Sequence, residues 1–173
     1  MNVILPQMRK MLGRWEVCML TPYKDTDGTW HIGYGHGNAN SFPPFVDENT
    51  VLKDEAEAMS ILVGELEKFY VPQLDHILLI GDIKLNDFQY NACLDIVYNR
   101  GIGTFRKSKC YDWLTKKGEK NNLAHAAEAM VNSNIEGFAP LNIAKDRVTG
   151  IERVYLGLTC RRIDDAALFQ TVA

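Results

Sequence analysis

The sequence contains no long hydrophobic run. No stretch of its 173 residues approaches the ~18–20 apolar residues that a membrane-spanning helix needs, so stable membrane insertion is not expected. The N-terminal segment MNVILPQMRKMLGRWE is interrupted by Pro6, Gln7, Arg9 and Lys10, and it therefore differs from the continuous apolar core of a secretory signal. We expect a protein that is made in a reducing cytoplasm and carries no export signal of its own.

Closely spaced cysteines and metal-binding histidines are also absent. The four cysteines form no C-x-x-C pair, and the pattern gives little support to a zinc or redox site: Cys18, Cys93, Cys110 and Cys160. We expect four reduced thiols, most of them buried, rather than a disulfide framework. His76 and His125 have no spacing typical of metal ligands, so no metal site is predicted.

An excess of positive charge is lacking too. The chain has 19 Lys and Arg against 22 Asp and Glu, a net charge of −3, which argues against a protein that coats nucleic acid. The charge is unevenly distributed: residues 1–80 hold 6 basic and 11 acidic side chains, and residues 81–173 hold 13 and 11. Seven basic residues lie between Arg100 and Lys120, which is typical of a solvated helix face or of a surface that binds an anionic polymer.

What is present is typical of a folded α+β protein. Apolar periodicity predicts a helix over 4–18, ended by Thr21-Pro22, and Asp27-Gly28 predicts a hairpin of two or three short antiparallel strands within 23–37. Residues 38–50 look like a loop and 134–155 look irregular. Further helices are expected over 53–72 with an extension to 80, and over 85–99, 108–117, 122–132 and 159–170.

These elements predict one domain, residues 1–173, with two lobes. A small N-terminal lobe (about 1–52) would contain the hairpin, a helix (53–80) would link the lobes, and residues 81–173 would form a helical lobe. A cleft between two lobes is a natural place for an extended ligand. We expect a monomer.

Two carboxylates and a histidine stand close together near the hairpin. Glu16 lies near the end of the first predicted helix, Asp25 nine residues on, and His31 six residues beyond that. Glycosidic bond cleavage needs a protonated carboxyl group for the leaving oxygen and a second group that activates water or attacks the sugar. On spacing alone, solvated surface carboxylates would be the simpler interpretation.

The surrounding residues resemble the signature of phage-type lysozymes, the endolysins of glycoside hydrolase family 24. Family members have Glu, eight residues, Asp, five residues and then Thr-Ile-Gly-Tyr-Gly-His, and this chain has HIGYGH at residues 31–36. Residues 23–25 (YKD), 53–57 (KDEAE), 88–105 and 157–162 (GLTCRR) are similar to later family motifs in the same order. The resemblance covers nearly the whole chain.

The resemblance implies a lysozyme-like fold and a muramidase that cleaves the β-1,4 bond between N-acetylmuramic acid and N-acetylglucosamine in peptidoglycan. It implies Glu16 as general acid, Asp25 as the group that stabilises positive charge and helps to activate water, and no cofactor. Asn99 matches a residue of the substrate cleft. Independently of the resemblance, Tyr34, Tyr98 and Phe105 are candidates for stacking on sugars, although most aromatic residues belong to the core. Arg162, or else Arg161, would orient Glu16 by an ion pair.

His31 departs from the family pattern, which usually has threonine there. Three roles are open: an imidazole that positions water, a nucleophile that gives a covalent intermediate and retention, or an inert histidine. His36 is interpreted as a structural histidine that anchors the hairpin. Gly33 and Gly35 most simply allow tight backbone approach in a short strand.

The resemblance also implies a biological setting. An endolysin without an export signal would accumulate in the host cytoplasm and depend on a holin to reach the wall. Alternatives are a muramidase used as a secreted antibacterial toxin or as a tail-associated enzyme, and, with less support, a peptidoglycan binder that has lost catalysis.

Overall fold

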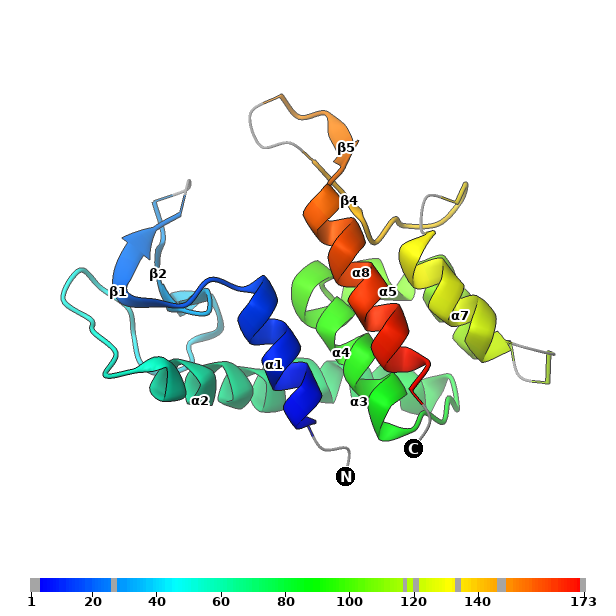
Figure 1. Ribbon diagram of the computed structural model, residues 1–173, viewed down its shortest axis with the longest axis horizontal. Helices are drawn as coiled ribbons and strands as arrows, with labels where there is room; N and C mark the ends of the chain where they lie inside the picture. Colours follow the sequence, from blue (N-terminus) through cyan, green and yellow to red (C-terminus); the bar gives the residue numbers. More distant parts are fainter. Residues whose placement is uncertain are drawn as a thin grey trace. The chain divides into compact units, whose positions relative to one another are not determined.

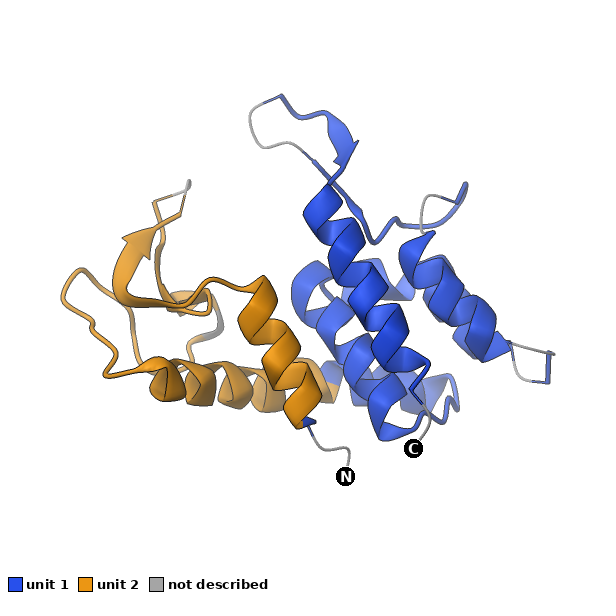
Figure 2. Cartoon of the chain, in the orientation of Figure 1, with its two compact units in different colours: residues 1–5, 73–173 blue, residues 6–72 orange. Residues whose placement is uncertain are grey.

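A computed structural model describes residues 4–25, 28–116, 118–119, 122–132, 135–145 and 149–171 (Figure 1). The chain divides into two compact units, coloured separately in Figure 2. The N-terminal unit is Pro6–Pro72, and the helical unit consists of Met1–Leu5 and Gln73–Ala173. That the two units make one domain stays a prediction. Their boundary falls inside the helix that was expected to link two lobes.

The N-terminal unit begins with α1 (Pro6–Trp15), which buries Met8, Met11 and Leu12. The prediction that this helix ends at Thr21-Pro22 is wrong, since both residues belong to strand β1 (Met19–Lys24). Proline is tolerated in a sheet at edges and bulges. Both conditions hold here, because β1 is an edge strand and its pairing is irregular between Met19 and Tyr23.

The predicted hairpin is a three-stranded antiparallel sheet in the order β1-β2-β3, with β2 over Trp30–Gly33 and β3 over His36–Gly37. Thr26 and Asp27 lie outside the described residues. The connection around them is closed by two backbone hydrogen bonds, from Asp25 N to Thr29 O and from Gly28 N to Asp25 O, both 2.9 Å. Gly33 and Gly35 have φ values of +62° and +89°, which explains glycine at both positions.

The linking helix is continuous but irregular. After the short 3₁₀ helix η1 (Asn38–Asn40) and a loop, α2 (Glu55–Glu65) starts at Asp54, whose side chain accepts the Glu57 N–H. A π-helical segment, η2 (Leu66–Tyr70), then leads into α3 (Val71–Ile80). The π-helical segment ends at Tyr70, two residues before Pro72, which has no N–H to donate, and the chain stays helical through the proline.

The described residues of the helical unit form five further helices. The bounds are α4 (Asp87–Arg100), α5 (Ile102–Arg106), α6 (Lys109–Thr115), α7 (Asn122–Val131) and α8 (Leu156–Phe169). Helix α4 packs against α8, and α7 packs against both α6 and α8 (Figure 1). Every residue from Tyr90 to Val97 is buried, so α4 is the centre of this core. Asn86 and Gln89 form a reciprocal capping box at its start.

Two elements of this unit were not predicted. Helix α5 follows Gly101, where a break was expected, and residues 134–155 contain an antiparallel hairpin of β4 (Ile143–Lys145) and β5 (Glu152–Val154). The side chains of β5 are all exposed, so the strand shows no alternation of apolar and polar residues. Within the described part of the chain, none of the helices has the length and apolar character needed to cross a membrane.

Candidate active site

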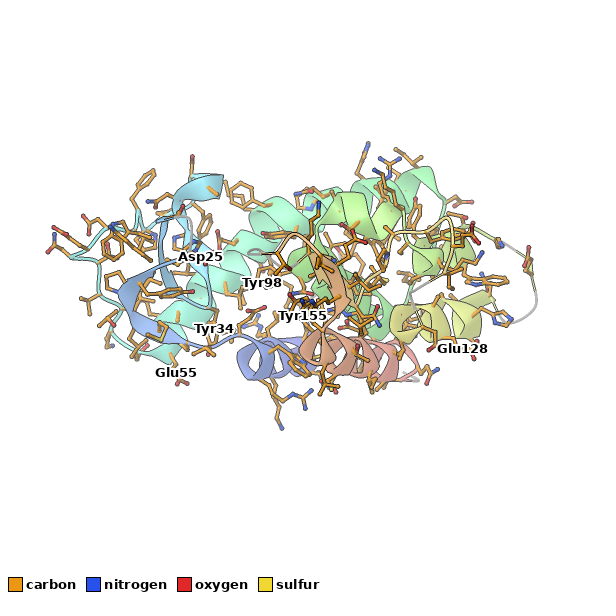
Figure 3. All side chains as sticks on the ribbon, turned by 90° about the horizontal axis from the view of Figure 1, so that it is seen from above. Asp25, Tyr34, Glu55, Tyr98, Glu128 and Tyr155 are labelled. Atoms are coloured by element: carbon orange, nitrogen blue, oxygen red, sulfur yellow. The ribbon has the colours of Figure 1, made fainter. Side chains whose placement is uncertain are left out.

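Glu16 and Asp25 lie at the ends of adjacent elements of the N-terminal unit. Glu16 follows α1 directly, and its N–H still donates to Leu12 O at 2.8 Å, so the last helical turn fixes its backbone. Asp25 follows β1 (Figure 3) and, like Glu16, is half-buried. Burial and then the charges of Asp25 and Glu16 raise the pKa of the Tyr23 hydroxyl. Tyr23 therefore lies within electrostatic range of both predicted carboxylates.

His31 lies next to the same tyrosine. Tyr23 and His31 are opposite each other in the β1–β2 pair, and their rings stack with centroids 5.8 Å apart and an interplanar angle of 29°. His31 Nδ1 is 3.1 Å from Gly35 O. Because a carbonyl oxygen only accepts, Nδ1 carries the proton of this bond. In the neutral ring Nε2 is then the unprotonated nitrogen, available to accept a proton or to bind water.

Gly37 makes room for the imidazole and was not predicted to matter for the site. Gly37 pairs with His31 across β2 and β3. A Cβ atom at position 37 would lie 2.9 Å from His31 Nδ1 and 3.0 Å from Cε1, closer than carbon atoms normally approach. Glycine is therefore a steric requirement of the observed ring position. Only the pairing of residues 31 and 37 in the sheet reveals this requirement.

His36 is a structural residue, as the sequence suggested. It is 3% exposed, its Nε2 lies 2.8 Å from Pro44 O, and its Nδ1 lies 3.2 Å from Glu65 Oε1. Burial lowers the pKa of His36, but the hydrogen bonds to Glu65 and Pro44 and the charge of Glu65 outweigh it, so the net shift is upward. The ion pair joins β3 to the end of α2.

The prediction that Tyr34 stacks on a sugar is wrong. Tyr34 is 7% exposed and lies in the core of the N-terminal unit (Figure 3), where its hydroxyl hydrogen-bonds with Cys18. Burial, followed by the nearby Cys18 and Glu55, raises the pKa of Tyr34. A buried ring offers no face to a ligand, because its hydrophobic area is already covered by protein.

All four cysteines are free thiols, and Cys93 and Cys110 are fully buried.

The other predicted substrate residues lie in the helical unit. Tyr98 and Asn99 are half-buried in the last turn of α4. Phe105 is 0% exposed and packs edge-on against Tyr111 with ring centroids 5.6 Å apart, so its predicted stacking on a sugar is also wrong. The accessible residues of this set are therefore Tyr98 and Asn99.

Arg161 and Arg162 belong to a buried charge cluster that the sequence analysis missed. Arg161 binds Asp95 in a two-pronged way, with Nε–Oδ2 at 2.8 Å and Nη2–Oδ1 at 2.9 Å. Arg162 Nη2 lies 3.3 Å from Asp95 Oδ2 and 3.3 Å from Asn99 Oδ1, and Arg162 Nε is 2.8 Å from Asp165 Oδ2. That Arg162 orients Glu16 stays a prediction. Two adjacent arginines in a helix that packs on the core were the available signal for buried acidic partners.

The two aspartates of this cluster have opposite pKa shifts. Both are 0% exposed. Burial raises the pKa of Asp95, but hydrogen bonds from Arg161 and the charges of both arginines lower it below its usual value. Burial and the charge of Asp95 raise the pKa of Asp165 well above its usual value. The cluster therefore holds one ionised carboxylate between two guanidinium groups, and a second carboxyl group that favours its proton.

The basic run of the helical unit is only partly available to a ligand. Lys109 and Lys116 lie 2.8 Å and 3.3 Å from Asp112, and both ammonium groups lie over the Trp113 ring. Lys107 is exposed, whereas Lys117 and Lys120 lie outside the described residues.

The described residues contain no cluster of three His, Cys, Asp or Glu side chains suited to a metal ion.

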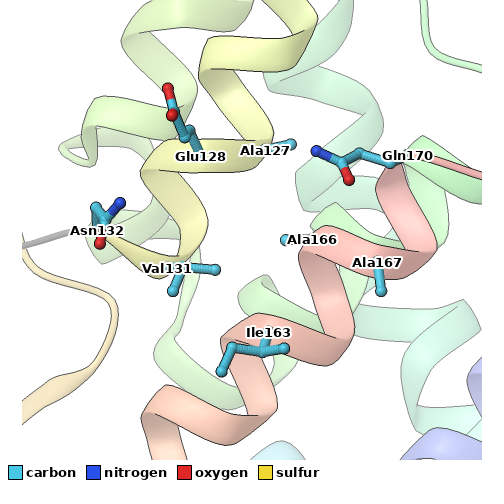
Figure 4. A pocket seen from close by; sticks show the side chains of 8 residues that line it. All are labelled: Ala127, Glu128, Val131, Asn132, Ile163, Ala166, Ala167 and Gln170. Carbon is cyan, nitrogen blue, oxygen red and sulfur yellow. The ribbon is translucent and has the colours of Figure 1, made fainter.

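A shallow groove between α7 and α8 contains none of the predicted site residues. Its volume is about 390 Å³ (Figure 4), and small or apolar side chains dominate its walls: Ala127, Glu128, Val131, Asn132, Ile163, Ala166, Ala167 and Gln170. It lacks convergent polar groups that would fix a substrate.

Comparisons with known proteins agree on the fold. The family model described as phage lysozyme matches residues 13–163, a range that contains all nine predicted site residues. The muramidase domain of SpmX from Asticaccaulis excentricus has a TM-score of 0.75 at 22% identity, covering 99% of this chain and 100% of that chain. A search among curated proteins finds no match.

Two phage proteins have similar structures. A variant of P22 lysozyme has a TM-score of 0.70 at 25% identity, covering 99% of this chain and 100% of that chain. An endolysin from Escherichia coli O157:H7 phage FAHEc1 has a TM-score of 0.69 at 20% identity, covering 97% and 93%. The predicted α+β fold, with a small antiparallel sheet and a helical region, is confirmed.

Proposed function

Because the chain belongs to the phage lysozyme family, and is thus a glycoside hydrolase, we propose that it hydrolyses the β-1,4 bond between N-acetylmuramic acid and N-acetylglucosamine in peptidoglycan. The observation that carries this proposal is the shared environment of Glu16 and Asp25, whose charges both act on Tyr23 beside His31. The family match includes all of these residues. No cofactor is required by this chemistry.

The proposed mechanism uses two carboxyl groups and one imidazole. Glu16 donates its proton to the leaving glycosidic oxygen, and the Glu16 carboxylate remains. Asp25 stabilises the positive charge that develops at the anomeric carbon. A water molecule attacks that carbon, and His31 Nε2 with Asp25 accepts its proton, because Nδ1 is held by Gly35 O. Attack by water on the face opposite the leaving group inverts the configuration.

The first experiment measures lysis and identifies the cleaved bond. Cells stripped of their outer membrane are treated with the protein and with Glu16→Gln, and the loss of turbidity is followed. Purified sacculi are digested in parallel, and the new reducing ends are identified after reduction with borohydride. We expect muramic acid at the reducing ends and no lysis by Glu16→Gln. Equal lysis by the two proteins would remove Glu16 from the mechanism.

The role of His31 is decided by the anomer that forms first. Proton NMR of a defined muropeptide oligomer during cleavage separates direct hydrolysis from a covalent intermediate. We expect an inverted product from the wild type. A retained product together with transglycosylation would instead make His31 Nε2 the nucleophile. An unchanged rate in His31→Ala would make the residue inert.

We further propose that the protein serves as an endolysin. It would act as a monomer, accumulate in the host cytoplasm and reach the periplasmic wall after a holin permeabilises the membrane. Expression in a bacterial host with and without a holin tests this: lysis only with the holin is expected. Lysis without a holin, or an adjacent immunity gene, would favour an exported antibacterial or tail-associated muramidase. Binding to sacculi without cleavage by the wild type would favour a non-catalytic wall binder.

A further inference from the structure

His31 lies on the middle strand of the three-stranded sheet and has one residue directly beside it on each neighbouring strand. Its partner on β1 is Tyr23, and its partner on β3 is Gly37. Directly paired residues of antiparallel strands point to the same face of the sheet. The imidazole therefore stands between a large aromatic side chain on one side and a residue without a side chain on the other.

Three contacts restrict the imidazole of His31. The Tyr23 ring stacks on it, with centroids 5.8 Å apart and an interplanar angle of 29°. Gly35 O lies 3.1 Å from Nδ1, and a Cβ atom at position 37 would lie only 3.0 Å from Cε1. Together these contacts fix the plane of the ring and the direction of its Nδ1–H bond. They thereby also fix the direction of the lone pair on Nε2, the atom to which the proposed mechanism assigns the proton of the attacking water.

The contact on the face of the imidazole is made by an uncharged aromatic ring. Burial, followed by the charges of Asp25 and Glu16, raises the pKa of the Tyr23 hydroxyl, so the phenol keeps its proton at neutral pH. Offset-stacked aromatic rings attract each other at centroid separations of about 4.5–7 Å, a range that includes the observed 5.8 Å. An aliphatic side chain could fill the same space, but it has no flat face against which the imidazole can align.

We propose that Tyr23 is a positioning residue for His31, whose ring fixes the plane of the imidazole and so holds Nε2 in one orientation toward the attacking water. The inference rests on the proposed function and deepens it, because it concerns the same proton transfer. A proton acceptor that is already oriented avoids the loss of rate that follows from a misplaced group. The threonine that the resembling family usually has at position 31 has no ring to stack, so this role belongs to the histidine of this chain.

The opposite face of the same hairpin provides a matched control. Neighbouring residues of a strand point to opposite faces, so the next pair along the two strands, Lys24 and Trp30, lies on the other face from Tyr23 and His31. The Lys24 ammonium group lies 4.7 Å from the centroid of the Trp30 ring. Trp30→Leu therefore removes a cross-strand aromatic contact between the same two strands, on the face that does not carry the imidazole.

The test is a double-mutant cycle in which kcat and KM are measured on a soluble muropeptide oligomer. Tyr23→Leu keeps an apolar side chain but loses the ring, and we expect kcat to fall about tenfold with little change in KM. Tyr23→Phe retains the stack and should keep kcat within about twofold of the wild type, as should the control Trp30→Leu. In a His31→Ala background, Tyr23→Leu should lower kcat by less than about twofold, because the ring no longer has an imidazole to position.

Two outcomes of the cycle contradict the inference. If Tyr23→Leu lowers kcat equally in the wild-type and His31→Ala backgrounds, Tyr23 contributes only to the fold of the hairpin. If Tyr23→Phe loses as much activity as Tyr23→Leu, the effect belongs to the hydroxyl group and not to the stacked ring. Either result would overturn the role proposed for the ring.

An NMR measurement keeps the test independent of catalysis. A stacked aromatic ring shifts the proton resonances of its neighbour, so the Hε1 and Hδ2 signals of His31 should move in Tyr23→Leu. They should stay near their wild-type positions in Tyr23→Phe and in Trp30→Leu. Unmoved His31 signals in Tyr23→Leu would overturn the inference. An inactive wild type whose His31 signals move in the expected way would overturn the proposed function and uphold the placement of the imidazole by Tyr23.

Discussion

Two pairs of carboxyl groups, one pair in each compact unit, differ in their exposure. In the N-terminal unit, Glu16 and Asp25 are half-buried at the ends of a helix and a strand. In the helical unit, Asp95 and Asp165 are 0% exposed and lie against Arg161 and Arg162. An accessible carboxyl group can exchange a proton with a substrate, whereas a sealed one contributes mainly to the uniqueness and stability of the fold. The two carboxylates proposed for catalysis are therefore accessible, and the two that contact arginines are fully buried.

Glu16→Gln should have the largest effect, and only on catalysis. An amide cannot donate the acid proton, so we expect kcat to fall by roughly 10²–10⁴-fold. Because Glu16 is half-buried at the end of α1, the free energy of unfolding should change by only about 0.5 kcal/mol. Steady-state digestion of sacculi and urea unfolding measure the two quantities. A large loss of stability with a normal kcat would instead make Glu16 a structural residue.

Asp95→Asn should mainly lower the stability of the fold rather than impair catalysis. Removing this charge leaves Arg161 and Arg162 buried with an incomplete set of partners, which costs about 3–5 kcal/mol of stability. The pKa of Asp95 is lowered in the folded state, so its contribution is present above its unfolded pKa and is lost as pH falls through the folded pKa. Urea unfolding at several acidic pH values checks both points. A stability equal to that of the wild type would show that the cluster is dispensable.

The His36–Glu65 pair places a buried charge in the N-terminal unit as well. Glu65→Gln should cost roughly 1.5–3 kcal/mol at a pH where His36 is charged, because a hydrogen bond between charged groups is lost. The folded pKa of His36 is raised, so the contribution is complete below its unfolded pKa and is lost as pH rises through the folded pKa. Thermal unfolding from pH 5.5 to 9 should show this loss in the wild type. The same loss in Glu65→Gln would contradict the assignment.

Gly37→Ala should reduce activity by about tenfold, since a modest displacement of a proton-accepting group removes part of its contribution. The added Cβ would lie 2.9 Å from His31 Nδ1, so the ring must move from the bond to Gly35 O. Gly35 needs no such space, as its φ of +89° accounts for it. The measurement is kcat on sacculi, with His31→Ala as reference. A normal rate in Gly37→Ala with a reduced rate in His31→Ala would show that the ring position is not critical.

Charge reversal in the basic run should have the smallest effect. Lys107 is exposed, so Lys107→Glu is expected to weaken binding to sacculi by about 0.2–1 kcal/mol, and less at high salt. Lys109→Glu differs because Lys109 is paired with Asp112, and its reversal also destabilises α6. Sedimentation of Glu16→Gln with sacculi over a range of salt measures binding without cleavage. Equal salt dependence with and without the Lys107 substitution would exclude this surface.

Local patterns predicted the helices and the first hairpin well. Helical periodicity and caps are properties of neighbouring residues, as at Asp54, Asn86 and Gln89, and these segments begin within two residues of the predicted starts. The β4–β5 hairpin was not predicted, because its exposed strand β5 has no alternating pattern of apolar and polar residues. The predicted helix end at Thr21-Pro22 was wrong, because a proline that usually ends a helix also fits an edge strand.

The predictions for the candidate site also differ between residues that are close in sequence and residues that are far apart. Glu16, Asp25 and His31 all lie in the N-terminal unit, as their closeness in sequence implied, and their catalytic roles stay predictions. Tyr34 and Phe105 were misjudged, because aromatic residues are equally suited to a core and to a sugar-binding surface. Asp95 was missed, because its partner Arg161 is 66 residues away along the chain.

Local patterns in the sequence were enough to predict the family, the order of the main helices and a set of candidate catalytic residues. These depend on local spacing, which is visible along the chain. The three-dimensional packing was needed to show which side chains are buried, that Gly37 leaves space for the His31 ring, and that β5 pairs with β4. Burial, close contact and strand pairing arise between residues that are distant in sequence, so packing alone assigns them.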